Sequence, residues 1–198
     1  MNKFLTQVTF FILLVGISFC GILTLADGRT DSYYIRFTVP KQNNLLIGSS
    51  RAAQGLQPRV LKEILGIDIF NYAFTARASP YGPVYFESIR KKLNSGRSDG
   101  IFILDVNPWS ISSRTEHPND STQFRELDSF VRRTPNVNTN PNFTYLKNNL
   151  GGNYYKILWN HSPVFLHQNG WLEVTVPMDS SSIRKRTQLR LKKYVKEN

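Results

Sequence analysis

A 22-residue stretch near the start of the chain contains no charged side chain, and it constrains the protein more than any other feature. It runs from Phe4 to Leu25, is rich in Phe, Leu, Ile and Val, and is preceded only by Lys3 and the amino terminus. A helix rises about 1.5 Å per residue, so a helix of this length matches the hydrocarbon core of a bilayer, which is about 30 Å thick. The sequence therefore predicts that residues 4–25 cross a membrane as one helix.

A cleaved signal peptide is the competing interpretation of this stretch. Such a peptide usually has a shorter apolar run followed by a small-x-small cleavage site, for which Thr24-Leu-Ala26 is a poor match. Cys20 also raises a lipoprotein interpretation, but Phe19 precedes it where lipoprotein processing requires a small residue. We expect an uncleaved anchor over residues 1–26 and a single domain over residues 27–198.

The charges on either side of the stretch predict its orientation. Lys3 and the amino terminus lie before it, whereas Asp27, Arg29 and Asp31 after it sum to −1. Because positive flanking charge favours the cytoplasmic side, the amino terminus should stay in the cytoplasm and the rest of the chain should be exported. The predicted location is the cell membrane, with one span and an extracytoplasmic domain.

The net charge of +11 is concentrated at the end of the chain. Seven basic residues and one acidic residue follow Ser180, a net charge of +6, whereas the preceding 179 residues carry 18 basic and 13 acidic side chains. No zinc-finger or RNA-recognition signature accompanies this excess, so we expect no nucleic-acid partner. The terminal segment is expected to be either a solvated helix face or a contact for anionic lipid or polymer.

A single cysteine excludes both an intramolecular disulfide and a Cys-based zinc cage. We therefore expect a domain held together by packing, with no metal and no cofactor.

Short apolar runs alternate with helical patterns from residue 45 to residue 106. The predicted elements are strands at 45–47, 67–74 and 101–106, helices at 58–65 and 83–93, a hairpin at 164–174 that turns at 168–170, and a basic amphipathic helix at 180–198. In the second helix, Val84, Ile89 and Leu93 should face inward. The residues between 110 and about 153 read as a long loop, suggesting a site-covering insertion or local disorder. The order strand, helix, strand, helix, strand predicts an α/β fold with a parallel sheet.

The working site of such a sheet lies at the carboxyl ends of its strands. Three loops should converge there, at residues 48–51, 75–79 and 107–109. Ser50 follows the first strand in the turn before a helix, a usual place for a nucleophile. The alternative is that Ser49 and Ser50 only cap the coming helix.

Three segments resemble sequence blocks of the SGNH or GDSL-like hydrolase superfamily. Leu46-Ile-Gly-Ser-Ser-Arg51 is similar to the first block, with Gly-Ser-Ser in place of Gly-Asp-Ser, and implies that Ser50 is the nucleophile. Asn71-Tyr-Ala-Phe-Thr-Ala76 is similar to the second block, with Ala76 where a glycine N–H donates to the oxyanion. Asp105-Val-Asn-Pro108 is similar to the third block, which implies that Asn107 is the side-chain oxyanion donor.

The resemblance implies a three-layer, flavodoxin-like parallel-sheet fold and ester hydrolysis or acyl transfer on a cell-envelope glycan. Arg51 and Arg77 flank two of the loops and are candidates for contacting an anionic substrate. The family activates its serine with the histidine of an Asp-x-x-His block, which this chain lacks. Its only histidines are His117, His161 and His167.

We therefore expect an incomplete fold that ends before the Asp-x-x-His block, and leave open whether the protein is an enzyme. The alternatives are a non-catalytic envelope binding protein and a truncated remnant. The oligomeric state is also left open.

Overall fold

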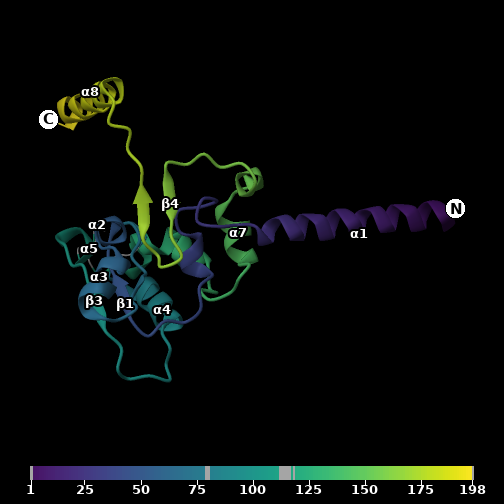
Figure 1. Ribbon diagram of the computed structural model, residues 1–198, viewed down its shortest axis with the longest axis horizontal. Helices are drawn as coiled ribbons and strands as arrows, with labels where there is room; N and C mark the ends of the chain where they lie inside the picture. Colours follow the sequence, from purple (N-terminus) through teal and green to yellow (C-terminus); the bar gives the residue numbers. More distant parts are fainter. Residues whose placement is uncertain (1, 79–80, 112–116, 118, 198) are drawn as a thin grey trace.

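A long helix, a mixed α/β domain and a detached terminal helix follow one another along the chain (Figure 1). The computed structural model describes residues 2–78, 81–111, 117 and 119–197. Helix α1 (Asn2–Thr24) projects from one side of the domain, and α8 (Ser180–Glu197) lies on another side at the end of an extended segment.

The domain is built on a parallel sheet with the strand order β2-β1-β3. Its strands are β1 (Leu45–Ile47), β2 (Phe70–Asn71) and β3 (Phe102–Leu104). The predicted α/β class and parallel pairing are confirmed. Beyond β2 the chain stays beside β1, because the Phe74 N–H donates to the Gly48 carbonyl at 3.1 Å.

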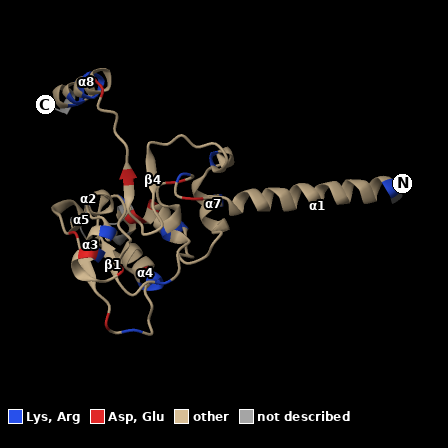
Figure 2. Ribbon diagram, in the orientation of Figure 1, with Lys and Arg blue, Asp and Glu red and all other residues tan. Residues whose placement is uncertain are grey.

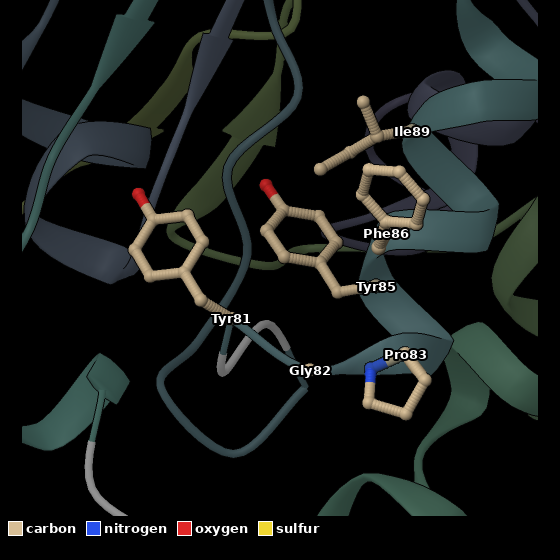
Figure 3. Close-up of a pocket in the computed structure, with 6 residues that line it drawn as sticks. All are labelled: Tyr81, Gly82, Pro83, Tyr85, Phe86 and Ile89. Carbon is tan, nitrogen blue, oxygen red and sulfur yellow. The ribbon is translucent and has the colours of Figure 1, made fainter.

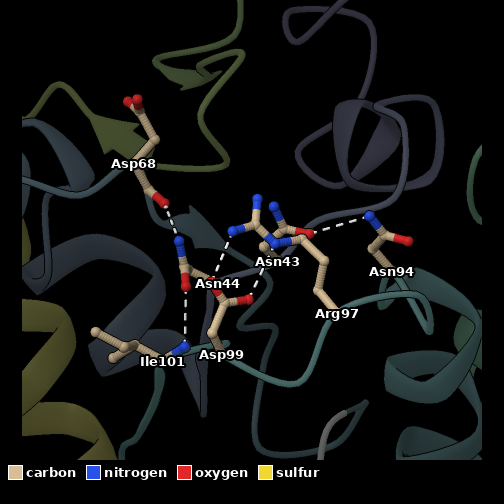
Figure 4. Close-up of polar contacts among 7 residues, drawn as sticks. All are labelled: Asn43, Asn44, Asp68, Asn94, Arg97, Asp99 and Ile101. Carbon is tan, nitrogen blue, oxygen red and sulfur yellow. Dashed lines mark hydrogen bonds and ion pairs between the residues drawn. The ribbon is translucent and has the colours of Figure 1, made fainter.

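One polar side chain joins the starts of the three strands. Asn44 donates from Nδ2 to the Asp68 carbonyl at 2.8 Å and accepts at Oδ1 from the Ile101 N–H at 2.9 Å (Figure 4). An exposed ion pair between Arg97 and Asp99 lies beside it. Asn44 therefore links the three strands at the amino edge of the sheet. The loops that follow the strands lie at the opposite, carboxyl edge.

Helices connect the strands as the sequence predicts. Helices α2 (Ser50–Gly55) and α3 (Pro58–Leu65) lead from β1 to β2, and α4 (Pro83–Lys92) leads from β2 to β3. Proline occupies the first turn of α3 and of α4, where its missing N–H costs no helical hydrogen bond. Gly66 ends α3 with a φ of +68°.

The buried face of α4 differs from the predicted one. Val84, Ile89 and Leu93 are only partly buried; the buried residues of the helix are Tyr85, Ser88 and Lys92. These polar side chains reach acceptors inside the domain: Tyr85 donates to the Tyr72 carbonyl at 2.6 Å and Lys92 to the Val137 carbonyl at 2.8 Å. An apolar pattern does not reveal such partners.

The long loop predicted after residue 110 is wrong for the described part of that segment, which contains short helices; residues 112–116 and 118 lie outside the described residues. The short helices are α5 (Pro108–Ile111), η2 (Ser121–Gln123), η3 (Arg125–Asp128), α6 (Phe130–Arg133) and α7 (Phe143–Asn149). The Asn142 side chain caps α7 by accepting from the Tyr145 N–H at 2.9 Å, and α7 buries Tyr145 and Leu146. These helices are short and are capped by polar residues that are also common in loops, so the sequence pattern predicted a loop.

The predicted hairpin is confirmed and packs by its turn against β2. Strands β4 (Val164–Leu166) and β5 (Leu172–Val174) pair antiparallel. The Asn71 N–H donates to the Asn169 carbonyl at 2.9 Å, so the hairpin turn covers the open side of β2.

A buried arginine holds the hairpin to the rest of the core. Arg36, in the short helix η1 (Tyr34–Phe37), donates to the carbonyls of Asn71 at 3.0 Å and Gly170 at 2.6 Å. Its guanidinium lies 5.3 Å from the centre of the Phe74 ring. Burial lowers the pKa of Arg36 to about 10, so the side chain remains a cation at neutral pH.

Helix α1 is exposed except where it meets the domain. It is long and apolar enough to cross a membrane, a property that a signal sequence near the N-terminus shares. At its domain end Leu23 and Ala26 are buried, and the Phe19 ring packs edge-on against Tyr154 in the short helix η4 (Tyr154–Ile157).

Basic side chains gather on α8, as the sequence predicts for this segment (Figure 2). The Asp179 carboxylate caps the helix by accepting from the Ser182 N–H at 2.9 Å. The large apolar side chains of α8 are exposed, so the described structure leaves the helix without a packed face.

Candidate functional site

Three polar side chains, two of them buried, join the loops that follow β1 and β3. The Ser49 hydroxyl donates to Oδ2 of Asp105 at 2.9 Å, and the Asn107 amide Nδ2 donates to the Ser49 hydroxyl at 3.2 Å. Ser49 is only 3% exposed, and Asn107 is also buried. The predicted meeting of loops 48–51 and 107–109 is therefore confirmed.

Gly48 permits the close approach of these two loops. A Cβ atom at Gly48 would lie 2.6 Å from the Cβ of Asp105 and 3.0 Å from the Cβ of Ala52. Real Cβ contacts are longer, so any side chain at this position would displace Asp105 or α2.

The loop after β2 reaches the same edge. The Tyr81 N–H donates to the Ser110 carbonyl at 2.8 Å, and the Tyr81 hydroxyl donates to the Asp105 carbonyl at 2.9 Å. Ser79, the last residue of the predicted loop 75–79, lies outside the described residues. The contact with the carboxyl edge is made by Tyr81, two residues beyond the predicted loop, which the sequence did not single out.

The predicted nucleophile and the predicted oxyanion donors lie in the segments that follow the three strands. Ser50 is the first residue of α2 and is partly exposed, and Ala76 is partly exposed in a turn. The Asn107 amide reaches Ser49, and its Oδ1 accepts from the Ser110 N–H at 3.1 Å. Within residues 2–78, 81–111, 117 and 119–197, no hydrogen bond joins Asn107 to Ser50 or Ala76.

The two arginines proposed to contact substrate are exposed. Arg51 lies on the first turn of α2, and Arg77 lies in the turn after β2. Both follow strand ends at the carboxyl edge of the sheet.

The histidines have other partners. His167 lies in the hairpin, where its Nε2 is 2.7 Å from a carboxylate oxygen of Glu173 and its ring stacks on Trp171. His161 accepts a hydrogen bond from the Trp159 indole at 2.7 Å. Across the part of the chain that is described, no hydrogen bond connects a histidine to Ser50.

An apolar groove adjoins the polar network. Its volume is about 350 Å³, and Tyr81, Gly82, Pro83, Tyr85, Phe86 and Ile89 line it (Figure 3). The Tyr81 and Tyr85 side chains lie next to each other, and both hydroxyls point to the same side. The Gly48 N–H donates to the Tyr85 hydroxyl at 3.3 Å. One wall of the groove therefore contacts the loop that carries Ser50.

Both tyrosines of the groove resist ionisation. Burial raises the pKa of Tyr85 well above its ordinary value and also raises the pKa of Tyr81. They are therefore neutral hydrogen-bond donors at physiological pH, and their rings supply apolar walls.

Sequence reasoning missed Asp105 and the two tyrosines. The signal for Asp105 was an acidic residue directly after an apolar strand, across the sheet from a Gly-Ser-Ser turn. Tyr81 and Tyr85 had no comparable signal. Among the described residues, no group of three His, Cys, Asp or Glu side chains lies close enough to hold a metal ion.

No protein-family model, characterised protein or solved structure matches this chain. Any function assigned to the chain therefore depends on the geometry of the site.

Proposed function

We propose that this chain is a membrane-anchored, extracytoplasmic SGNH-like protein of the three-layer, flavodoxin-like class. Its site at the carboxyl edge of the sheet takes an ester or acyl group of the cell envelope, with Ser50 as the nucleophile. The observation that carries the proposal is the hydrogen-bond network of the buried Ser49 and Asn107 with the partly buried Asp105, which joins two strand ends directly beside Ser50.

The strand order supports this assignment of fold. The order β2-β1-β3 is that of the first three strands in a flavodoxin-like doubly wound sheet, which binds ligands at the carboxyl ends of its strands. Ser50 and Asn107 both follow such strand ends.

The difference in exposure between Ser49 and Ser50 supports Ser50 as the reacting serine. The hydroxyl of Ser49 is buried and occupied by Asp105 and Asn107, whereas Ser50 is partly exposed. The SGNH-like block has an acidic residue where this chain has Ser49. Here Asp105 brings a carboxylate to that place from the neighbouring strand.

The apolar groove supports an acyl substrate. Its walls are mostly carbon, and its two hydroxyls are already bonded to backbone groups. It would accept an acyl chain or another apolar group more readily than a sugar. Arg51 and Arg77 would then face the polar part of the substrate.

A serine hydroxyl is a weak nucleophile without a base to take its proton. Because the described residues place no histidine at Ser50, we expect slow reaction with strongly activated electrophiles rather than rapid turnover.

A fluorophosphonate probe tests the proposal on the full chain in detergent. We expect labelling of the wild type and of Ser95→Ala, an exposed control serine, and loss of labelling in Ser50→Ala. A folded wild type that takes no label would contradict the proposed hydrolase site.

A second candidate is a non-catalytic envelope binding protein. It is favoured by the Asn107 amide, which is committed to Ser49, and by the exposed basic helix α8. In this case binding of an envelope glycan or anionic polymer would survive Ser50→Ala and weaken as salt is added.

The packing of α1 favours an anchor over a cleaved signal. Cleavage after Ala26 would remove Leu23 and Ala26, both of which are buried against the domain. Intact mass of the membrane-extracted chain distinguishes the two, since an anchor leaves residues 1–26 in place.

A further inference from the structure

Three large side chains around helix η4 are exposed on one face. Tyr155 is 63%, Leu158 64% and Trp159 72% exposed. The turn continues past η4 because the N–H groups of Leu158 and Trp159 both donate to the Tyr155 carbonyl. The spacing i, i+3, i+4 places the three side chains on the same side of this turn. We call them the aromatic turn.

The aromatic turn lies beside the domain end of α1. Tyr154, which precedes it, packs its ring against Phe19 of α1 at a centroid distance of 5.5 Å. Phe19 is five residues before the end of α1 at Thr24, which corresponds to about 8 Å along the helix axis. Figure 1 shows this turn next to the point where α1 enters the domain.

A second contact ties the turn to the residues after α1. The Asn160 side chain donates to the Arg29 carbonyl. Arg29 lies five residues after Thr24, the last residue of α1. The position of the aromatic turn relative to α1 therefore depends on contacts at both of its ends. It would move with α1 as one unit.

The chemistry of the turn suits the surface layer of a bilayer. Tyr and Trp prefer this layer because their rings are apolar and carry one polar group. The exposed Tyr155 can turn its hydroxyl to water and headgroups, whereas the Trp159 indole N–H donates to the His161 ring and leaves an apolar ring surface exposed. Arg29 and Lys156 flank the turn and could meet lipid phosphates. An exposed apolar cluster facing only water would be unfavourable.

We propose that Tyr155, Leu158 and Trp159 rest in the headgroup layer of the bilayer that α1 spans. This inference depends on the membrane anchor of the proposed function. The turn gives the domain a second membrane contact and sets one orientation of the carboxyl-edge site relative to the lipid.

Tryptophan quenching by lipid tests the inference on the full chain. The protein is placed in nanodiscs of ordinary or acyl-brominated phospholipid, and the fraction of Trp emission quenched by bromine is measured. Of the three tryptophans, only Trp159 belongs to the aromatic turn. We expect quenching in the wild type and its loss in Trp159→Phe.

Trp109→Phe is the matched control. Trp109 is also exposed, at 57%, but lies in α5 at the carboxyl edge of the sheet. The quenched fraction should stay equal or rise in this variant, because it removes emission that lipid does not reach. Quenching that is unchanged in Trp159→Phe, or that disappears in Trp109→Phe, overturns the inference.

Co-purification separates this result from failure of the anchor. If the chain does not remain in the discs, the anchor proposal fails. If it remains there and shows no quenching that depends on Trp159, the anchor stands and the inference about the aromatic turn fails.

Discussion

Ser49 and Ser50 are neighbours at the end of β1, but their side chains have different environments. The Ser49 hydroxyl sits between Asp105 and Asn107 and is shielded from water. Ser50 starts α2 and is partly exposed. Ser49 therefore holds two loops together, whereas Ser50 is partly open to solvent.

Replacing each serine by alanine separates these roles. Ser49→Ala removes one donor from the partly buried Asp105 carboxylate and the acceptor of the buried Asn107 amide, which should lower the free energy of unfolding by about 1–3 kcal/mol. Ser50→Ala should change it by no more than about 0.5 kcal/mol. Urea denaturation of the full chain in detergent measures both. Equal changes in the free energy of unfolding for the two variants would show that the hydrogen bonds of the Ser49 hydroxyl do not stabilise the fold.

Lys92 is a buried cation whose described partners include no carboxylate. Its Nζ donates to the Val137 carbonyl and lies 5.2 Å from the centre of the Phe70 ring. Burial lowers the pKa of Lys92 to about 7 from 10.5. Between these two values the unfolded chain holds a proton that the folded chain has released.

This difference predicts how stability depends on pH. Where the unfolded state binds more protons, stability rises with pH, so it should increase from pH about 7 towards pH about 9, by at most about 1.4 kcal/mol per unit. Lys92→Met should remove this increase. Lys91→Met, at the exposed neighbouring position, should retain it. Urea midpoints across this pH range provide the measurement, and an unchanged slope in Lys92→Met would refute the assignment.

Among the elements, the hairpin depends most clearly on one backbone position. Gly170 has a φ of +82°, and a Cβ there would lie 2.1 Å from the Asn71 carbonyl oxygen. Gly170 therefore meets two separate requirements, a left-handed turn and close packing against β2.

A pair of glycine substitutions separates these requirements. Gly152 has a φ of +84° but nothing within 4 Å of the position of a Cβ. Gly152→Ala should cost about 1–2 kcal/mol from the left-handed backbone alone. Gly170→Ala should cost clearly more, because the hairpin must move away from β2. Thermal unfolding of the two variants gives the difference, and similar losses would mean that the hairpin turn adjusts freely.

The elements differ in how far local sequence defines them. Helices α3 and α4 begin with proline, and α3 ends at Gly66, so short-range signals were enough to predict them. Helix α7 is short and begins with Asn142, which looks like a loop residue in the sequence. It is stabilised by contacts distant in sequence, including the hydrogen bond from the Asn142 amide to the Phe37 carbonyl.

Strand β3 shows what an apolar run in the sequence leaves undetermined. Its apolar run predicted a strand at 101–106, and in the structure Phe102 and Leu104 of this strand are exposed. The described residues pair it on one side only, with β1. Apolar sequence therefore identified the strand correctly but not its degree of burial.

At the scale of the whole molecule, α1 and the domain share a small packed interface. Leu23 and Ala26 bury their side chains against the domain, and Phe19 contacts Tyr154. Helix α1 is therefore not joined to the domain by a free linker. Its last turn is part of the core.

Two leucines of α1 test this coupling. Leu23→Ala should lower the stability of the domain in detergent by about 2–5 kcal/mol, the usual cost of emptying a buried leucine site. Leu14→Ala, in the exposed middle of the helix, should leave domain stability unchanged. Urea unfolding monitored by tryptophan emission measures both, and no loss in Leu23→Ala would mean that α1 and the domain are independent.

Local sequence was sufficient for the apolar N-terminal helix, the alternation of strands and helices to β3, the hairpin and the basic terminal helix. Each of these depends on spacing, turn residues or charge within a short window. Long-range packing decided the rest: the Asn107 amide donates to the buried Ser49 hydroxyl, Lys92 and Arg36 are buried, and the aromatic turn lies beside α1. Buried polar side chains take positions in which they are hydrogen-bonded. Folding brings their partner atoms together from segments far apart in the chain, so local sequence does not identify those partners.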